Sequence, residues 1–193
     1  MTTWALLAPG PSASKALADR LLGFKVGAIG NAYQLAPWAE FLAATDGGWW
    51  RKHPDAKEFA GDKYAMHGVS GVELVRIPPI GICNSGVLGL EVAKSKGAKR
   101  ILLCGFDMHG SHFFGQYTNG LRNTSPGQRE QHKKQFKAWA FANRKVEVIN
   151  CTEGSALTCF PVARLEEFIE TGVPESAADE CRPRGVVCAG AAA

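Results

Sequence analysis

Short apolar segments alternate along this chain with turns and with segments of helical spacing. Two of the apolar segments, 3–8 and 100–105, show no polar alternation, which is typical of parallel strands covered on both faces. Strands that alternate with helices in this way predict an α/β fold: a Rossmann-like, mostly parallel sheet with helices on both faces. The predicted strands are 3–8, 25–30, 40–46, 63–67, 72–77, 100–105 and 146–150.

The stretch 84–107 gives the clearest indication of a ligand site. Asn84 or Ser85 can cap a helix there, and Gly86 removes the side chain that would keep a ligand from the helix amides. The apolar strand that follows ends in Gly105-Phe106-Asp107. This order is half of a nucleotide-binding unit, although α/β proteins without a nucleotide also contain a glycine-bearing helix before a strand.

Other strand ends carry turn or polar residues of the same kind. The first strand stops before Gly10, Pro11 and Ser12, while Asn31 follows the second strand and Asp46 closes the third. The carboxyl ends of parallel strands share one edge of the sheet, where open α/β sheets bind ligands. The first turn lacks the GxGxxG pattern of dehydrogenases, and a plain structural turn is the alternative there.

An irregular segment, 108–127, follows the strand end at Asp107. A segment of this length inside a compact domain is usually a functional lid or is disordered. Its Tyr117 can hydrogen-bond a ligand, and His132 lies on the inward face of the next helix, as a site residue or as a buried structural histidine. Three histidines occur in this region, but no carboxylate or cysteine completes a metal-binding set, so we expect no metal.

Length and composition indicate one domain. The 193 residues are 46% hydrophobic, which predicts a single domain over 1–171, with a closing helix at 161–171 and a flexible tail at 172–193. No segment reads as a signal peptide or reaches the ~20 apolar residues that cross a bilayer. We therefore expect a cytoplasmic protein with reduced thiols and no membrane partner.

Basic residues concentrate in one region although the net charge is only +4. Between positions 122 and 145 there are seven basic residues and one acid. This is either a solvated helix face or a surface for a phosphate-rich ligand or nucleic acid. The seven residues are Arg122, Arg129, Lys133, Lys134, Lys137, Arg144 and Lys145.

Two adjacent tryptophans, Trp49 and Trp50, are not expected to face the same core. Either one of them is a stacking platform for a base or a sugar, or both fix a long loop to the domain.

Four of these segments resemble the bacterial sialyltransferases of glycosyltransferase family 42. The chain also resembles proteins related to these enzymes: the flagellin-modifying motility accessory factors, archaeal pterin diphosphokinase-like proteins and short phage-encoded members of this Rossmann-like group. The resemblance extends from about Leu6 to Phe160. It rests on the segments 8–12, Asn31, 84–86 and 104–107.

The resemblance implies metal-independent, inverting transfer of a sugar from a nucleotide-sugar, without a further cofactor. His132 matches the general base, and Tyr117 matches a lid tyrosine that stabilises the departing phosphate. The basic run would suit a polyanionic acceptor such as DNA. Pro9 stands where the family has Asn, and a second lid tyrosine has no counterpart. A catalytically inactive protein that binds a nucleotide or a nucleotide signal is therefore the alternative function.

Overall fold

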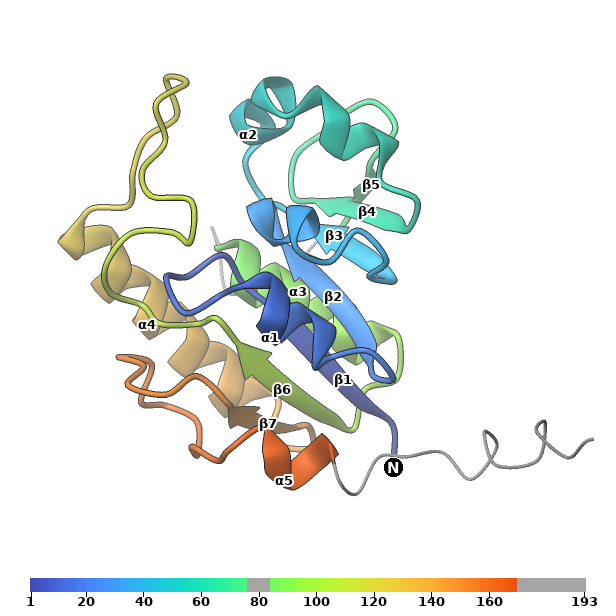
Figure 1. The fold of residues 1–193 in the computed structure, drawn as a ribbon, viewed down its shortest axis with the longest axis vertical. Coiled ribbons are helices and arrows are strands. Elements are labelled where there is room, and N and C mark those ends of the chain that lie inside the picture. The colour runs from blue at the N-terminus through green and yellow to red at the C-terminus, as the bar shows by residue number, and fades with distance from the viewer. Residues whose placement is uncertain (76–83, 170–193) are drawn as a thin grey trace, which may run out of the picture.

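The computed structural model describes residues 1–75 and 84–169, which form one sheet of seven parallel strands (Figure 1). The strand order is β5-β4-β3-β2-β1-β6-β7. This confirms the predicted α/β, Rossmann-like fold class. The strands are β1 (Thr3–Leu7), β2 (Lys25–Ile29), β3 (Phe41–Ala43), β4 (Asp62–Ala65), β5 (Glu73–Leu74), β6 (Arg100–Cys104) and β7 (Glu147–Asn150).

Helices cover both faces of the sheet, as the buried clusters on its two sides show. One layer is formed by α3 (Ser85–Ser95) and α4 (Pro126–Ala142). The other layer contains the shorter helices α1 (Lys15–Asp19), α2 (Gly47–Lys52) and α5 (Glu166–Ile169). Two 3-10 helices complete the described elements, η1 (Gly30–Gln34) and η2 (Pro54–Glu58).

The unbroken apolar character of β1 follows from this two-sided burial. Trp4 and Leu6 pack into the layer of α3 and α4, whereas Ala5 and Leu7 pack into the opposite layer. All four side chains are at most 1% exposed. A strand that contributes alternate residues to two cores has no solvent side, so it carries no polar period.

The chain order places a crevice at the carboxyl edge of the sheet. From β1 the chain proceeds outward through β2 to β5, and it then returns to place β6 on the other side of β1. The connections after β1 and after β6 therefore diverge at this edge. Such a topological switch point is where open α/β sheets bind their ligands.

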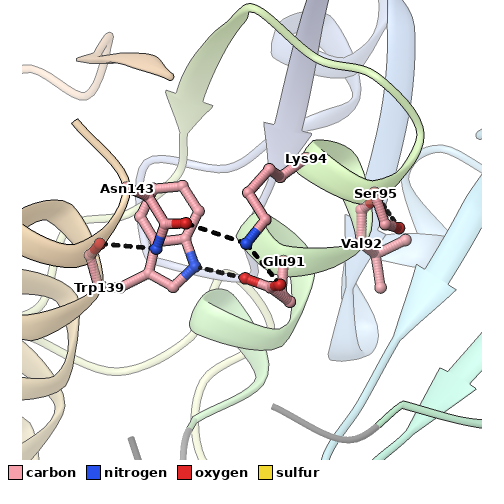
Figure 2. A network of polar contacts seen from close by, with 6 residues as sticks. All are labelled: Glu91, Val92, Lys94, Ser95, Trp139 and Asn143. Atoms are coloured by element: carbon pink, nitrogen blue, oxygen red, sulfur yellow. Dashed lines mark hydrogen bonds and ion pairs between the residues drawn. The ribbon is translucent and has the colours of Figure 1, made fainter. Parts of the chain in front are cut away.

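A polar network holds α4 on α3 (Figure 2). The Trp139 indole donates to Glu91 at 2.9 Å, and the Lys94 ammonium pairs with the same carboxylate at 2.6 Å. Lys94 also donates to the Asn143 side-chain oxygen at 2.9 Å, while the Asn143 amide donates to the Trp139 carbonyl at 2.9 Å. The network fixes the second half of α4, and with it the helix that carries His132.

Three sequence-based expectations need correction. Trp49 and Trp50 do share one core cluster, because Trp50 reaches inward to donate to the Ala44 carbonyl while Trp49 packs edge-on against it. The lid ends at Ser125, since α4 already begins at Pro126. The closing helix begins only at Glu166, because the chain before it runs extended and Val162 bridges to β7.

The predicted tail, 172–193, lies outside the described residues, as do positions 76 and 77 of the fifth predicted strand. None of the helices in the described part of the chain is long and apolar enough to cross a bilayer.

Candidate functional site

A cleft of about 690 Å³ lies at the carboxyl edge of the sheet. It is enclosed by the loops after β1 and β6, the start of α3, the first turns of α4 and the lid segment, which we define as residues 108–125. In Figure 1 the lid segment extends past this edge, on the same side of the molecule as α2. The predicted site residues that line the cleft are Gly10, Asp46, Asn84, Ser85, Gly86, Gly105, Phe106, Asp107, Tyr117 and His132.

Gly10 allows the loops after β1 and β6 to touch. Its N–H donates to the Gly105 carbonyl at 3.0 Å. A Cβ atom at Gly10 would lie 2.0 Å from a carboxylate oxygen of Asp107 and 2.4 Å from the Gly105 oxygen. Any larger residue would separate the two loops that form the cleft floor.

Asp107 braces the first loop from its position at the end of β6. Asp107 is 3% exposed, and its carboxylate accepts hydrogen bonds from the Ser12 hydroxyl at 2.8 Å and the Ser12 N–H at 3.3 Å. Pro11 and Ser12 do not line the cleft. Ser12 therefore contributes to the site by holding Asp107 rather than by facing the cleft.

The first turn of α3 lines the cleft, and its backbone N–H groups are the part of it that can bind a ligand. The Asn84 side chain caps the helix by accepting from the Val87 N–H at 3.0 Å, and the Ser85 hydroxyl accepts from the Thr45 N–H at 3.1 Å. The first N–H groups of any α-helix, here those of Ser85 and Gly86, have no acceptor within the helix. These amides and the positive end of the helix dipole favour an anion.

Gly86 is also required by packing. A Cβ atom there would lie 2.6 Å from the Phe136 ring and 2.8 Å from the Phe106 ring. These two rings meet edge to face, with centroids 5.9 Å apart, and they form an apolar wall next to the helix amides. A ligand in this position would contact both backbone donors and aromatic carbon.

His132 lines the cleft from α4 and is half-buried. Burial lowers the pKa of its imidazole below the ordinary value of 6.5. The side chain is thus neutral at neutral pH and can accept a proton. The cause of this shift is desolvation, which disfavours the charged imidazolium form.

The lid segment is tied to the sheet side of the cleft by its Tyr117. The Tyr117 hydroxyl donates to the Asn31 side-chain oxygen at 2.7 Å. Burial raises the pKa of this phenol to about 12, so the hydroxyl keeps its proton. Asn31 itself is 4% exposed and lies behind the cleft lining, where it holds Tyr117 instead of a ligand.

The charged groups of the cleft favour an anionic ligand. Arg122 and Arg129 line it, and Arg129 also donates to the Gly110 carbonyl of the lid segment. Asp46 is engaged as the cap of α2, accepting from the Gly48 N–H at 2.7 Å. Together with the braced Asp107, this leaves the two arginines as the prominent charges. Among residues 1–75 and 84–169, no three His, Cys, Asp or Glu side chains converge to hold a metal ion.

Sequence reasoning did not place Arg122 and Arg129 in the cleft, because they stood in a basic run that extends well beyond the site. The available signal was position, since Arg122 falls within the expected lid and Arg129 on the first turn of the next helix. Of the two tryptophans considered as a stacking platform, Trp49 lines the cleft, although it is only 6% exposed.

Comparison of the chain with protein-family models, with curated proteins and with solved structures finds no significant match.

Proposed function

We propose that this protein transfers a sugar from a nucleotide-sugar to an acceptor hydroxyl, with inversion, and that His132 is the general base. One observation carries the proposal: a single cleft contains the open amides of α3, two arginines and a neutral histidine. Amides and arginines suit a phosphate, and a neutral imidazole suits a proton acceptor. The resemblance to glycosyltransferase family 42 supplies the reaction class, and metal independence is part of that resemblance.

In the proposed reaction His132 takes the proton of the acceptor hydroxyl as its oxygen attacks the anomeric carbon. The bond from this carbon to the phosphate oxygen breaks, and the nucleotide leaves with the electron pair. The amides of Ser85 and Gly86, with Arg122 and Arg129, stabilise the charge that develops on the phosphate. Tyr117 would assist there once its hydroxyl has left Asn31.

The pKa of His132 determines the pH range of this step. Because the pKa is lowered by burial, the imidazole remains a base at lower pH than a free histidine does. The acid limb of the pH–rate profile should accordingly have its midpoint below about 6.5.

The acceptor we propose is a polyanion such as DNA. Arg129 at the cleft is followed at intervals of four residues by Lys133 and Lys137, which places all three along one side of α4. Lys133 and Lys137 also line a groove of about 210 Å³ between α4 and the segment 156–159. The lysines of this surface outnumber its one acid, Glu130, which pairs with Lys133, and the surface continues along α4 from the cleft.

Salt dependence tests the acceptor. Binding of a fluorescent DNA oligonucleotide should weaken steeply with salt, and a Lys133→Ala/Lys137→Ala variant should lower the slope of log K against log salt by roughly 2. Lys57→Ala, which removes an exposed lysine on η2, is the control and should leave the slope unchanged. DNA binding that is independent of both lysines would exclude this surface.

The alternative is a nucleotide-binding protein without catalysis. The Tyr117 hydroxyl is already bonded to Asn31, and Pro9 lacks the polar side chain of the family. Release of free nucleotide from CMP-, UDP- or GDP-sugars, measured with and without DNA or sugar acceptors, separates the two functions. Acceptor-dependent release that is lost in His132→Ala and kept in His67→Ala supports the enzyme. Nucleotide binding without release supports the alternative.

A further inference from the structure

Four side chains form a closed hydrogen-bond network behind the cleft. The oxygen of the Asn31 amide accepts from the Trp49 indole at 2.8 Å and from the Tyr117 hydroxyl at 2.7 Å. The nitrogen of the same amide meets Nε2 of His53 at 3.1 Å, and Nδ1 of His53 meets the Trp49 carbonyl at 2.9 Å. Asn31, Trp49 and His53 are each less than 9% exposed, so water does not replace these partners.

The chemistry of the partners fixes every proton in this network. An indole N–H can only donate, so the amide oxygen of Asn31 must face Trp49, and its NH2 must face His53. Nε2 of His53 is then an acceptor and carries no proton. The proton lies on Nδ1, from which it is donated to the Trp49 carbonyl. The neutral Nδ1-protonated imidazole is thus the form in which every donor of the network faces an acceptor.

We propose that His53 is a positioning residue for the cleft, which fixes the orientation of the Asn31 amide and through it the lid residue Tyr117 and the cleft residue Trp49. If Nε2 could not accept, the Asn31 NH2 would be left unpaired inside the protein. Turning the amide over would instead direct its NH2 at the indole N–H, so that two donors would face each other. Either outcome disrupts the contact that holds the lid segment at Asn31.

The stacking of His53 on Trp49 gives the ring a structural contribution as well. The two rings are nearly parallel, with centroids 4.4 Å apart. A test must therefore separate loss of the ring from loss of the Nε2 acceptor. His53→Gln and His53→Asn both remove the ring, but only the glutamine side chain is long enough to place an acceptor oxygen near the position of Nε2.

Hydrogen exchange of the lid-segment amides, read by mass spectrometry, tests the proposal. We expect His53→Gln to retain protection within about threefold of the wild type, and His53→Asn and Tyr117→Phe to lose about tenfold or more, as expected from one lost buried hydrogen bond. Equal protection in His53→Gln and His53→Asn would overturn the proposal. This measurement needs no nucleotide, so its failure is distinct from a failure of the proposed function.

The wild-type protein offers a second test that does not depend on any variant folding. In nitrogen-15 NMR of the histidine rings at neutral pH, His53 should show a protonated Nδ1 and an unprotonated Nε2. A proton on Nε2 would contradict the assignment.

The consequence for ligand binding rests on the proposed nucleotide site: CMP, as a probe, should bind at least about tenfold more weakly to His53→Asn than to His53→Gln. Equal affinities would limit the role of His53 to the lid segment and overturn its role in the cleft.

Discussion

The Ser12 hydroxyl lies 2.8 Å from a carboxylate oxygen of Asp107, and the hydrogen bond between them joins the loops that follow β1 and β6. These two loops diverge at the switch point of the sheet and form the floor of the cleft. This hydrogen bond occupies the Asp107 carboxylate, which would otherwise be free to contact a ligand in the cleft. The floor of the cleft is consequently held by an acid, while amides and basic side chains face the cleft.

Removing this brace should destabilise the fold. Asp107→Ala deletes an acceptor that is 3% exposed and leaves the Ser12 N–H and hydroxyl without it, so we expect a loss of about 1–3 kcal/mol in the free energy of unfolding. Ser12→Ala keeps the bond from its N–H and should cost less, about 1 kcal/mol. Urea unfolding of both variants measures the difference. A larger loss in Ser12→Ala than in Asp107→Ala would contradict the brace.

The contact of the two loops makes a second prediction, at Gly10. A methyl group there would overlap both Asp107 and the Gly105 carbonyl, so Gly10→Ala should lower the free energy of unfolding by about 1–3 kcal/mol. Gly127→Ala is the matched control, because its Cβ would meet no atom within 4 Å and it lies in the first turn of α4. It should be neutral or stabilise by up to about 1 kcal/mol. Thermal or urea unfolding compares them, and equal effects would argue against close contact at Gly10.

The network between α3 and α4 supplies a third prediction (Figure 2). Trp139→Phe removes the indole donor to Glu91 and should cost about 1–3 kcal/mol, because this bond is to a charged and mostly buried acceptor. Glu91→Gln keeps an acceptor for the indole and should cost under about 1 kcal/mol, the range of a partly exposed ion pair with Lys94. Urea unfolding measures both losses in the free energy of unfolding. A larger loss in Glu91→Gln than in Trp139→Phe would contradict the view that the indole bond supports the helix pair more than the ion pair with Lys94 does.

Local patterns were sufficient to predict the fold class and the start of α3. The unbroken apolar character of 3–8 and 100–105 indicated central parallel strands, and Asn84, one of the two candidate caps, is the cap of α3. Both signals act within a few residues, so they need no knowledge of distant contacts.

Such local patterns could not predict contacts between segments that are far apart in the sequence. Asn31 was expected to face a ligand, but Trp49, His53 and Tyr117 surround its side chain, and the last of these is 86 positions away. The two tryptophans share a core because Trp50 donates to the Ala44 carbonyl and Trp49 packs edge-on against it, which their adjacency in the sequence could not reveal. Strand-end position predicts proximity to the cleft, whereas the direction of each side chain depends on which partners the fold supplies.

The lowered pKa of His132 makes a fourth prediction, on stability and pH. Its folded pKa lies below the value of about 6.5 expected in the unfolded chain, so the unfolded state binds more protons between these two values. The free energy of unfolding should therefore fall as the pH is lowered through about 6.5, and level off below the folded pKa. His132→Gln does not titrate and should lose part of this decrease between pH 7.5 and 5.5. An unchanged pH dependence in the variant would contradict a buried, neutral His132.

Nucleotide binding at the cleft is the central claim, and a thermal-unfolding screen of the full chain tests it most directly. CMP-, UDP-, GDP- and ADP-linked ligands should be compared at concentrations up to the millimolar range. We expect at least one to raise the unfolding temperature, since a ligand at 100 times its Kd stabilises a protein by about 2.7 kcal/mol. Stabilisation should be lost when Arg122 and Arg129 are both replaced by alanine. An unfolding temperature that no nucleotide changes would contradict both the transferase and the nucleotide-binding alternative.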